Sequence, residues 1–254
     1  MRRLENKVIF VAGAGGIGGG LARRYAEEGA RVLLGDIDLA AAEEVVQAIN
    51  DAGHSAASIR LDGSDEDSVN AAVSFCVEKL GGLDGLHANF ASLADSNREQ
   101  GILELPLETF DLTQRVNVRG YYLCTRAALP VMLAAGGGSI VYTSSIGAYT
   151  GGAAQVAYSM SKAAGHALMR HVATRYGPQG VRANTIAPGL ILHPAAEAEI
   201  SEELLAMCCA RASIKSRTGR PTDIAALGAL LLSDEGGYIT GQVICVDGGT
   251  TMRA

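Results

Sequence analysis

Proline and cysteine are scarce in this sequence, and their scarcity excludes several classes of protein. The 254 residues include 6 prolines, too few for a Pro-rich linker or a low-complexity tract. The 5 cysteines are an odd number, and none are spaced as CxxC. This pattern suggests neither a disulfide framework nor a zinc site. We therefore expect reduced, mostly buried cysteines, no metal, and a single domain over residues 1–254.

An excess of positive charge is also lacking, as is a clear membrane-spanning segment. The formal net charge is −6 and the basic residues form no stripe, so a nucleic-acid partner is not expected. The uncharged stretch from Val8 to Ala22 is too short and too rich in glycine to span a bilayer. The beginning Met1-Arg2-Arg3 precedes a strand pattern, where a secretory signal would have an apolar core. The sequence predicts a cytoplasmic protein without a membrane segment.

The sequence does contain a regular alternation of short β-branched runs and longer amphipathic segments. Strands are predicted at residues 7–12, 31–36, 57–61, 85–89, 139–143, 181–187 and 243–246. Helices are predicted from about residue 17, over 39–51, up to residue 80, over 107–135 and 155–176, and from residue 221. Several strands are apolar on both faces, which favours a parallel sheet covered by helices on both sides. We predict a Rossmann-like, doubly wound α/β fold of about seven strands.

A glycine-rich turn directly follows the first predicted strand. Gly13, Gly15 and Gly18 satisfy the pattern GxGxxG and lead into a helix, with Gly16 and Ile17 inside the turn. Such glycines let the backbone approach a pyrophosphate, which the helix N-terminus stabilises through its N–H groups and its dipole. The alternative is a purely structural turn. Its place after the first strand of a βαβ series favours dinucleotide binding at these five residues.

Acidic residues follow the next two strands. Asp36 ends the second strand, where a carboxylate accepts hydrogen bonds from an adenosine ribose and repels a 2′-phosphate. We therefore expect NAD, with NADP less favoured; Arg23 and Arg24 are the residues that could favour NADP. The alternative is that Asp36 or Asp38 only caps the following helix.

A second acidic residue, Asp62, closes the third predicted strand. It is expected to face the adenine, with an ordinary turn residue as the alternative. The neighbours of the two carboxylates, Ile37 and Gly63, are expected to contact the cofactor with them.

The most informative stretch lies between the fifth strand and the helix that follows it. Ser145 follows the strand, and Tyr158 and Lys162 are four positions apart in YSMSK, a spacing that puts both side chains on one helix face. An adjacent ammonium should lower the pKa of the tyrosine from about 10 by roughly 1 to 3 units. Tyr158 would then exchange a hydroxyl proton near neutral pH, while Ser145 holds the substrate oxygen.

With these residues in order, the chain resembles the short-chain dehydrogenase/reductase family over its whole length. The resemblance implies an enzyme that moves a hydride between NAD and a secondary alcohol or ketone. It implies that Asn117 completes a catalytic tetrad by holding a water that links Lys162 to solvent, or else is a buried structural amide. The further cofactor contacts that it implies are Asn89, Tyr158, Lys162, Pro188, Gly189 and Ile191. A homotetramer or homodimer is expected on the same basis.

Three features depart from the family pattern. The turn after the first strand is one residue shorter than usual and begins at Ala12 without the usual threonine or serine. Phe90 and Ala91 put a bulky ring and an extra methyl group close to the cofactor. His193 takes the place of a threonine that meets the nicotinamide, and it is expected to replace that contact, to touch substrate or to lie in a loop. The other histidines, His54, His87, His166 and His171, are interpreted as ordinary surface or core residues.

The substrate is the least determined feature. Residues 190–217 are where this family has a substrate lid. Within them, Ile200, Leu204, Met207 and Cys208 suggest an amphipathic helix, for which ordinary packing is the alternative. Tyr149, Phe90 and Leu93 are expected to border the pocket, which favours an apolar or alicyclic alcohol. Two other functions stay open: a reductase of 3-oxoacyl thioesters that uses NADPH, and a protein that senses NAD without catalysis.

Overall fold

The computed structural model describes residues 2–92, 101–151 and 155–252. Seven parallel strands form one sheet in the order β3-β2-β1-β4-β5-β6-β7. The strands are β1 (Val8–Ala12), β2 (Arg31–Asp36), β3 (Ser55–Arg60), β4 (Gly85–Ala88), β5 (Gly138–Thr143), β6 (Val181–Pro188) and β7 (Val243–Val246). The predicted doubly wound α/β fold is confirmed.

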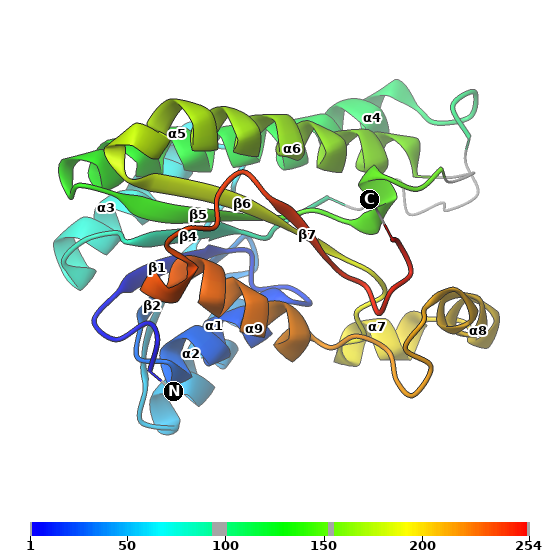
Figure 1. The fold of residues 1–254 in the computed structure, drawn as a ribbon, viewed down its shortest axis with the longest axis horizontal. Helices are drawn as coiled ribbons and strands as arrows, with labels where there is room; N and C mark the ends of the chain where they lie inside the picture. The colour runs from blue at the N-terminus through cyan, green and yellow to red at the C-terminus, as the bar shows by residue number, and fades with distance from the viewer. Residues whose placement is uncertain (1, 93–100, 152–154, 253–254) are drawn as a thin grey trace.

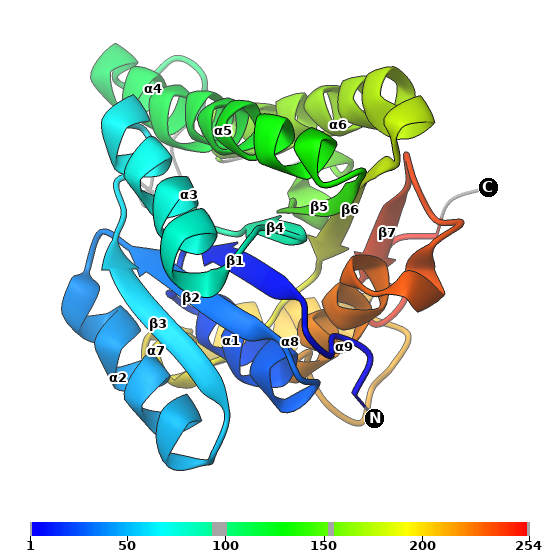
Figure 2. The ribbon, with the colours of Figure 1, turned by 90° about the vertical axis from the view of Figure 1, so that its left-hand side faces the viewer.

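Helices cover both faces of the sheet (Figures 1 and 2). On one face lie α1 (Gly18–Glu27), α2 (Leu39–Asp51) and α9 (Pro221–Leu232). On the other lie α3 (Glu66–Leu80), α4 (Leu107–Gln114), α5 (Gly120–Ala134) and α6 (Val156–Tyr176). None of the helices in the described ranges is long and apolar enough to cross a membrane.

The first strand shows why its sequence is apolar throughout. Successive side chains of a strand point to opposite faces. Phe10 therefore belongs to the hydrophobic cluster on the α3 and α5 side, while Ile9 and Val11 belong to the cluster on the α1 and α9 side. Both clusters exclude water, so every residue of β1 is buried.

The strand order reverses at β1, which pairs with β2 on one side and β4 on the other. In doubly wound sheets ligands bind beyond the carboxyl ends of the strands at this switch point. The turns after β1, β2, β4 and β5 carry most of the predicted site residues, so the topology brings them to one edge.

The helix predicted over residues 107–135 is interrupted. A π-helical turn, Arg115–Arg119, separates α4 from α5 and contains Asn117. Every residue there is compatible with a helix, so the sequence pattern does not reveal the interruption. Turns of this kind are frequent at functional sites.

The prediction of one amphipathic helix after Pro188 is wrong about its continuity. The segment forms two short helices, α7 (Pro194–Glu199) and α8 (Glu202–Arg211), and Ile200 lies between them. Ser201 caps α8 by accepting a hydrogen bond from the Leu204 amide at 3.2 Å. Met207 is 51% exposed, so about half of this apolar side chain is left uncovered.

Candidate active site

The glycine-rich turn joins β1 to α1 at the switch point. Gly13 has φ +107°, and its amide donates to the carbonyl oxygen of Gly35 at 2.7 Å. A Cβ on Gly18 would overlap the carbonyl oxygen of Gly13, whereas one on Gly15 would meet no atom within 4 Å. The turn is therefore closed on its inner side and open on its outer side. The open side allows the close approach that a pyrophosphate requires.

Asp36, the last residue of β2, is tied to this turn. Its Oδ2 accepts hydrogen bonds from the amides of Ala14 at 2.6 Å and Gly15 at 3.3 Å. Its Oδ1 accepts one from the Asp38 amide at 2.9 Å. Asp38, rather than Asp36, caps α2, since its carboxylate accepts from the Ala41 amide. Asp36 therefore supports the shortened turn from the position at which a ribose would bind.

Asp62 lies two residues beyond the end of β3, which ends at Arg60 and not at residue 61. Its carboxylate accepts hydrogen bonds from the amide and the hydroxyl of Ser64 at 2.9 and 2.8 Å. Burial raises the pKa of Asp62, but the Ser64 hydrogen bonds together with Arg115 and Arg60 outweigh it and lower the pKa. The Asp62 carboxylate is thus charged and hydrogen-bonded within a turn, while its contact with adenine stays a prediction.

Ile37, the residue after Asp36, is 62% exposed, and its contact with the cofactor likewise stays a prediction.

A buried chain of polar side chains connects the glycine turn to the end of β5. Asn89 Nδ2 donates to the carbonyl oxygen of Gly13 at 3.2 Å, and Asn89 Oδ1 accepts from Thr143 Oγ1 at 2.9 Å. His87 bridges Thr143 Oγ1 at 2.9 Å and Tyr25 Oη at 2.6 Å. Asn89 thus holds the turn from inside the protein.

His87 lies in the core, within what the sequence suggested, and has two specific hydrogen-bond partners. The Thr143 hydroxyl proton goes to Asn89, so the His87 Nε2–H must donate to Thr143, and Nδ1 accepts from Tyr25. Burial lowers the pKa of His87 to about 3, so its ring is neutral at physiological pH. No spacing rule indicates these partners, because Tyr25 lies on α1, His87 on β4 and Thr143 on β5.

Lys162 and Tyr158 lie one turn apart on α6, as predicted. The Lys162 side chain is buried, and Nζ donates to the carbonyl oxygen of Thr143 at 2.7 Å and to Tyr121 Oη at 3.0 Å. Nζ is 5.6 Å from the centroid of the Tyr158 ring. Burial lowers the pKa of Lys162 to about 7. The half-buried Tyr158 ring therefore lies over a buried amine whose charge changes near neutrality.

Ser145 follows β5 by two residues, and its Oγ accepts from the Gly147 amide at 3.0 Å. It begins the short 3₁₀ turn Ile146–Ala148 and remains partly exposed at the sheet edge. Its neighbour Ser144 is buried and bonds to His166 Nε2 at 2.7 Å. His166, like His87, has a specific partner that the sequence did not indicate.

Asn117 has partners other than Lys162. Its Oδ1 accepts from the Ser92 amide at 2.6 Å, and its Nδ2 donates to Ser161 Oγ at 2.9 Å and to the Ser92 carbonyl at 3.3 Å. The side chain therefore joins the segment after β4 to α6. These contacts fit the buried structural amide that was the alternative for Asn117, and its place in a catalytic tetrad, through a water linked to Lys162, stays a prediction.

The Phe90 ring packs against glycines of neighbouring segments. Cβ atoms on Gly63 and Gly120 would overlap it, at 2.6 Å from its Cε2 in the case of Gly120. The ring meets the Tyr121 ring edge to face, with centroids 5.3 Å apart. Two glycines thus make room for the bulky residue, which packs against the hydrophobic core.

The segment after β6 completes the edge. Gly189 donates to the Val246 carbonyl at 3.0 Å, and a Cβ there would lie 2.8 Å from Asp247 Cα. Ile191 is buried and forms a bridge with Gly219. His193 accepts a hydrogen bond from the Ala196 amide at 3.4 Å and caps α7. Its Nε2 would lie 3.0 Å from a Cβ on Gly16, so this histidine lies beside the glycine turn.

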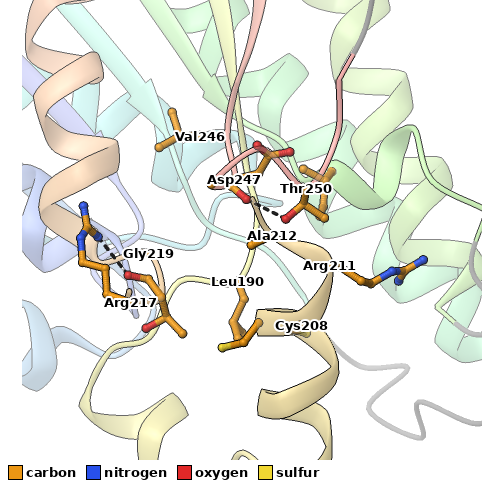
Figure 3. A pocket seen from close by; sticks show the side chains of 13 residues that line it. Leu190, Cys208, Arg211, Ala212, Arg217, Gly219, Val246, Asp247 and Thr250 are labelled. Carbon is orange, nitrogen blue, oxygen red and sulfur yellow. Dashed lines mark hydrogen bonds between the residues drawn. The ribbon is translucent and has the colours of Figure 1, made fainter. Parts of the chain in front are cut away.

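A hollow opens between the end of β7, α8 and the turn after β5 (Figure 3). It holds about 570 Å³, open solvent at its mouth included. Apolar groups from separate segments face it, among them Ile146, Leu190 and Val246, together with Cys208 of α8. Phe90 and Tyr149 do not line it; Tyr149 stacks on His166 with centroids 4.9 Å apart. Leu93, the third residue expected at the pocket, lies outside the described residues.

Known proteins resemble the chain over nearly its whole length. A family model described as enoyl-(acyl carrier protein) reductase matches residues 11–251. A probable short-chain type dehydrogenase/reductase of Bradyrhizobium diazoefficiens is 42% identical over 257 residues, covering 98% of this chain and 89% of the relative. Cis-4-hydroxycyclohexanecarboxylate dehydrogenase of Sinomonas cyclohexanicum is 37% identical, with 97% of each chain covered. A solved 7α-hydroxysteroid dehydrogenase, in complex with NADH and 7-oxo glycochenodeoxycholic acid, has a TM-score of 0.91 at 33% identity, covering 97% of this chain and 95% of that one.

Proposed function

The chain belongs to the short-chain dehydrogenase/reductase family, and we propose that it interconverts alicyclic secondary alcohols and ketones with NAD as the cofactor. Membership makes it an oxidoreductase that acts on hydroxyl or keto substrates. The observation that carries the proposal is the pair on α6, in which the buried Lys162 amine lies beneath the Tyr158 ring.

The switch-point edge fits a nicotinamide dinucleotide. The outer side of the turn at Gly15 is open, as a pyrophosphate requires. In this proposal the turn from Gly13 to Gly18 holds the pyrophosphate, Asp36 binds the adenosine ribose, and Asn89 supports the turn. Pro188, Gly189 and Ile191 would hold the nicotinamide end.

NAD is favoured over NADP by charge. The Asp36 carboxylate stands at the ribose position and repels a 2′-phosphate. Arg24, which could have attracted that phosphate, is paired with Glu28 at 2.6 Å. Glu28 also binds Arg3 at 2.6 Å, so this ion pair belongs to a fixed cluster.

The bound nicotinamide supplies the group that accepts or returns the hydride. In alcohol oxidation, Tyr158 Oη takes the hydroxyl proton as the carbinol hydrogen leaves with its electron pair. Ser145 donates to the substrate oxygen and fixes its direction. Lys162 favours the tyrosinate through its charge and would hold the cofactor ribose. In ketone reduction Tyr158 returns the proton to the oxygen.

An alicyclic substrate is supported by the apolar side of the hollow and by the relatives. The relative from Sinomonas is named for a hydroxycyclohexane acid, and the solved relative holds a steroid acid. We propose that the substrate enters beside Ile146 and Leu190, and that residues 190–217, with α7 and α8, form its lid. The lid is part of the single catalytic domain, residues 1–254.

Absorbance of NADH tests the proposal. Purified protein is given NAD or NADP with cyclohexanols, hydroxycyclohexanecarboxylates, steroids and polyols. Turnover with NAD and a cyclic alcohol supports it. Tyr158→Phe should abolish turnover and keep NADH binding, while Tyr238→Phe, at a fully exposed tyrosine, should change neither.

Near-wild-type activity of Tyr158→Phe would overturn the proton-transfer role. Strong preference for NADPH with a 3-oxoacyl thioester would favour the reductase alternative. NADH binding without turnover of any of these alcohols would favour a sensing role. A homotetramer or homodimer, and a cytoplasmic location, stay predictions.

A further inference from the structure

Tyr121 is a buried tyrosine on α5 that no sequence motif indicated. It is 3% exposed, and its ring lies against Phe90 and Tyr142, with centroids 5.3 and 5.7 Å away. Its hydroxyl donates to the carbonyl oxygen of Thr143 at 2.8 Å and accepts from Lys162 Nζ at 3.0 Å. The hydroxyl is therefore fixed as both a donor and an acceptor.

The hydrogen bonds of Lys162 show what this arrangement does. An ammonium has three N–H donors. Within the described part of the chain, Nζ bonds to the Thr143 carbonyl oxygen and to Tyr121 Oη. These two acceptors leave the third N–H for the ribose or for Tyr158. The Tyr121 ring also lies 5.0 Å from Nζ, a distance at which a ring face attracts a cation.

We propose that Tyr121 is a positioning residue, whose buried hydroxyl holds the Lys162 ammonium beneath Tyr158 and directs its third N–H toward the reacting groups. The proposal rests on the function proposed above. In this proposal the residue that anchors Lys162 is Tyr121, one helical turn beyond Asn117. The Asn117 side chain itself bonds to Ser92 and Ser161.

The consequence for acid–base chemistry follows from the charge. Tyr121→Phe removes an acceptor that stabilises the charged amine and keeps the ring. Burial already lowers the pKa of Lys162, and loss of this hydrogen bond lowers it further, so Tyr158 loses part of its cationic partner. In the pH profile of alcohol oxidation, the limb where the rate rises with pH should move to higher pH by about 0.5 to 1 unit. At a fixed pH on that limb, the rate should fall by about 3- to 10-fold.

Other ionisable side chains act on Tyr121 or lie near Lys162. Burial has the largest effect on the pKa of Tyr121 and raises it; Tyr158, Cys124 and Tyr142 also raise it through their charge. His166 lies one turn along α6 from Lys162 and bonds to Ser144. Of these, Tyr158 is the group that we expect to titrate together with Lys162.

The first test is the pH profile of kcat and kcat/KM for wild type, Tyr121→Phe and Tyr142→Phe. Tyr142 is the matched control, because its equally buried hydroxyl bonds to Thr125 Oγ1 at 2.7 Å instead of Lys162. Only Tyr121→Phe should shift the limb, with the KM for alcohol within twofold of wild type. An unshifted limb, or an equal shift in Tyr142→Phe, overturns the proposal.

The second test needs no turnover. The tyrosinate ultraviolet band is titrated in wild type and in Tyr158→Phe, and their difference reports Tyr158. The same difference is then measured with Tyr121→Phe in both proteins, and it should move to higher pH. A Tyr158 titration that moves in a protein inactive on every alcohol supports the positioning role and overturns the proposed substrate class. A titration that stays in place overturns the positioning role whatever the activity.

Discussion

Replacing Asp36 by asparagine should convert the cofactor preference while keeping the shape of the side chain. The carboxylate oxygens accept three backbone hydrogen bonds, from Ala14, Gly15 and Asp38. Asparagine retains one acceptor oxygen and loses the negative charge. The variant should therefore fold, bind NAD less tightly and accept NADP.

The magnitude follows from Coulomb's law and the position of the group. Asp36 is partly exposed, so a water-like dielectric applies, with about 1 kcal/mol for each pair of unit charges at 4 Å. A 2′-phosphate carries about 1.5 to 2 charges, and removing the repulsion gains about 1.5–2 kcal/mol, or roughly 10- to 30-fold. Replacing charge-assisted ribose hydrogen bonds by neutral ones costs NAD about 1 kcal/mol, roughly fivefold. The NAD-to-NADP ratio of kcat/KM should fall by about 50-fold or more.

The assay measures the initial rate at which NADH or NADPH absorbance rises, at saturating alcohol and varied NAD or NADP. Asp38→Asn is the matched control. Asp38 lies on the same segment and caps α2, a task that asparagine performs equally well. Its variant removes one negative charge without touching the ribose position. A ratio that moves less than threefold in Asp36→Asn, or equally in Asp38→Asn, refutes the charge argument. Unfolding temperatures separate loss of turn support from loss of cofactor contact.

Two further substitutions test buried charges by denaturant unfolding at several pH values. Glu28→Gln removes the negative charge that pairs with Arg3 and Arg24, at a side chain that is 4% exposed. The free energy of unfolding should fall by about 2–4 kcal/mol. Burial raises the pKa of Glu28, but its hydrogen bonds and ion pairs with the two arginines outweigh burial and lower the pKa overall. The stability that the Glu28 carboxylate contributes to the fold is therefore present above about pH 4.3 and is lost as the pH falls. An equal cost at pH 3 and pH 7 would contradict this. Lys162→Met should abolish activity yet stabilise the fold by about 2–4 kcal/mol at pH 7, because the pKa of Lys162 falls from its ordinary value to about 7 on burial. That gain should shrink from pH 7 toward pH 10. In this range Lys162 is protonated in the unfolded chain but largely neutral in the folded one, so wild-type stability rises with pH. A gain independent of pH would contradict the lowered pKa of Lys162.

Local patterns were sufficient for most of the fold. Strands and helices alternate with the expected periods, and β2 and β7 have the predicted bounds. The turn at Arg115–Arg119 was not predictable, because a π-turn changes the hydrogen-bond register without changing which residues suit a helix. The break at Ile200 depended on Ser201 capping a new helix, a local signal that apolar spacing alone concealed.

For the site, spacing along one element was more informative than composition. Tyr158 and Lys162 were predictable together, because four residues on a helix place them on one face. Tyr121, His87 and His166 were not, since each meets its partner across elements far apart in sequence. The packing of Phe90 was equally hidden, because it depends on Gly63 and Gly120 lying opposite its ring.

Thr143 connects the two halves of the candidate site. Its hydroxyl bonds to His87 and to Asn89, and Asn89 in turn holds the glycine turn. Its carbonyl oxygen accepts from Lys162 and Tyr121. Because a strand end in a buried parallel sheet has little freedom to move, the turn that would hold the cofactor and the amine that would serve the proton transfer keep a constant separation. The buried lysine opposes folding at neutral pH, and its hydrogen bonds to β5 and α5 are what hold it in place.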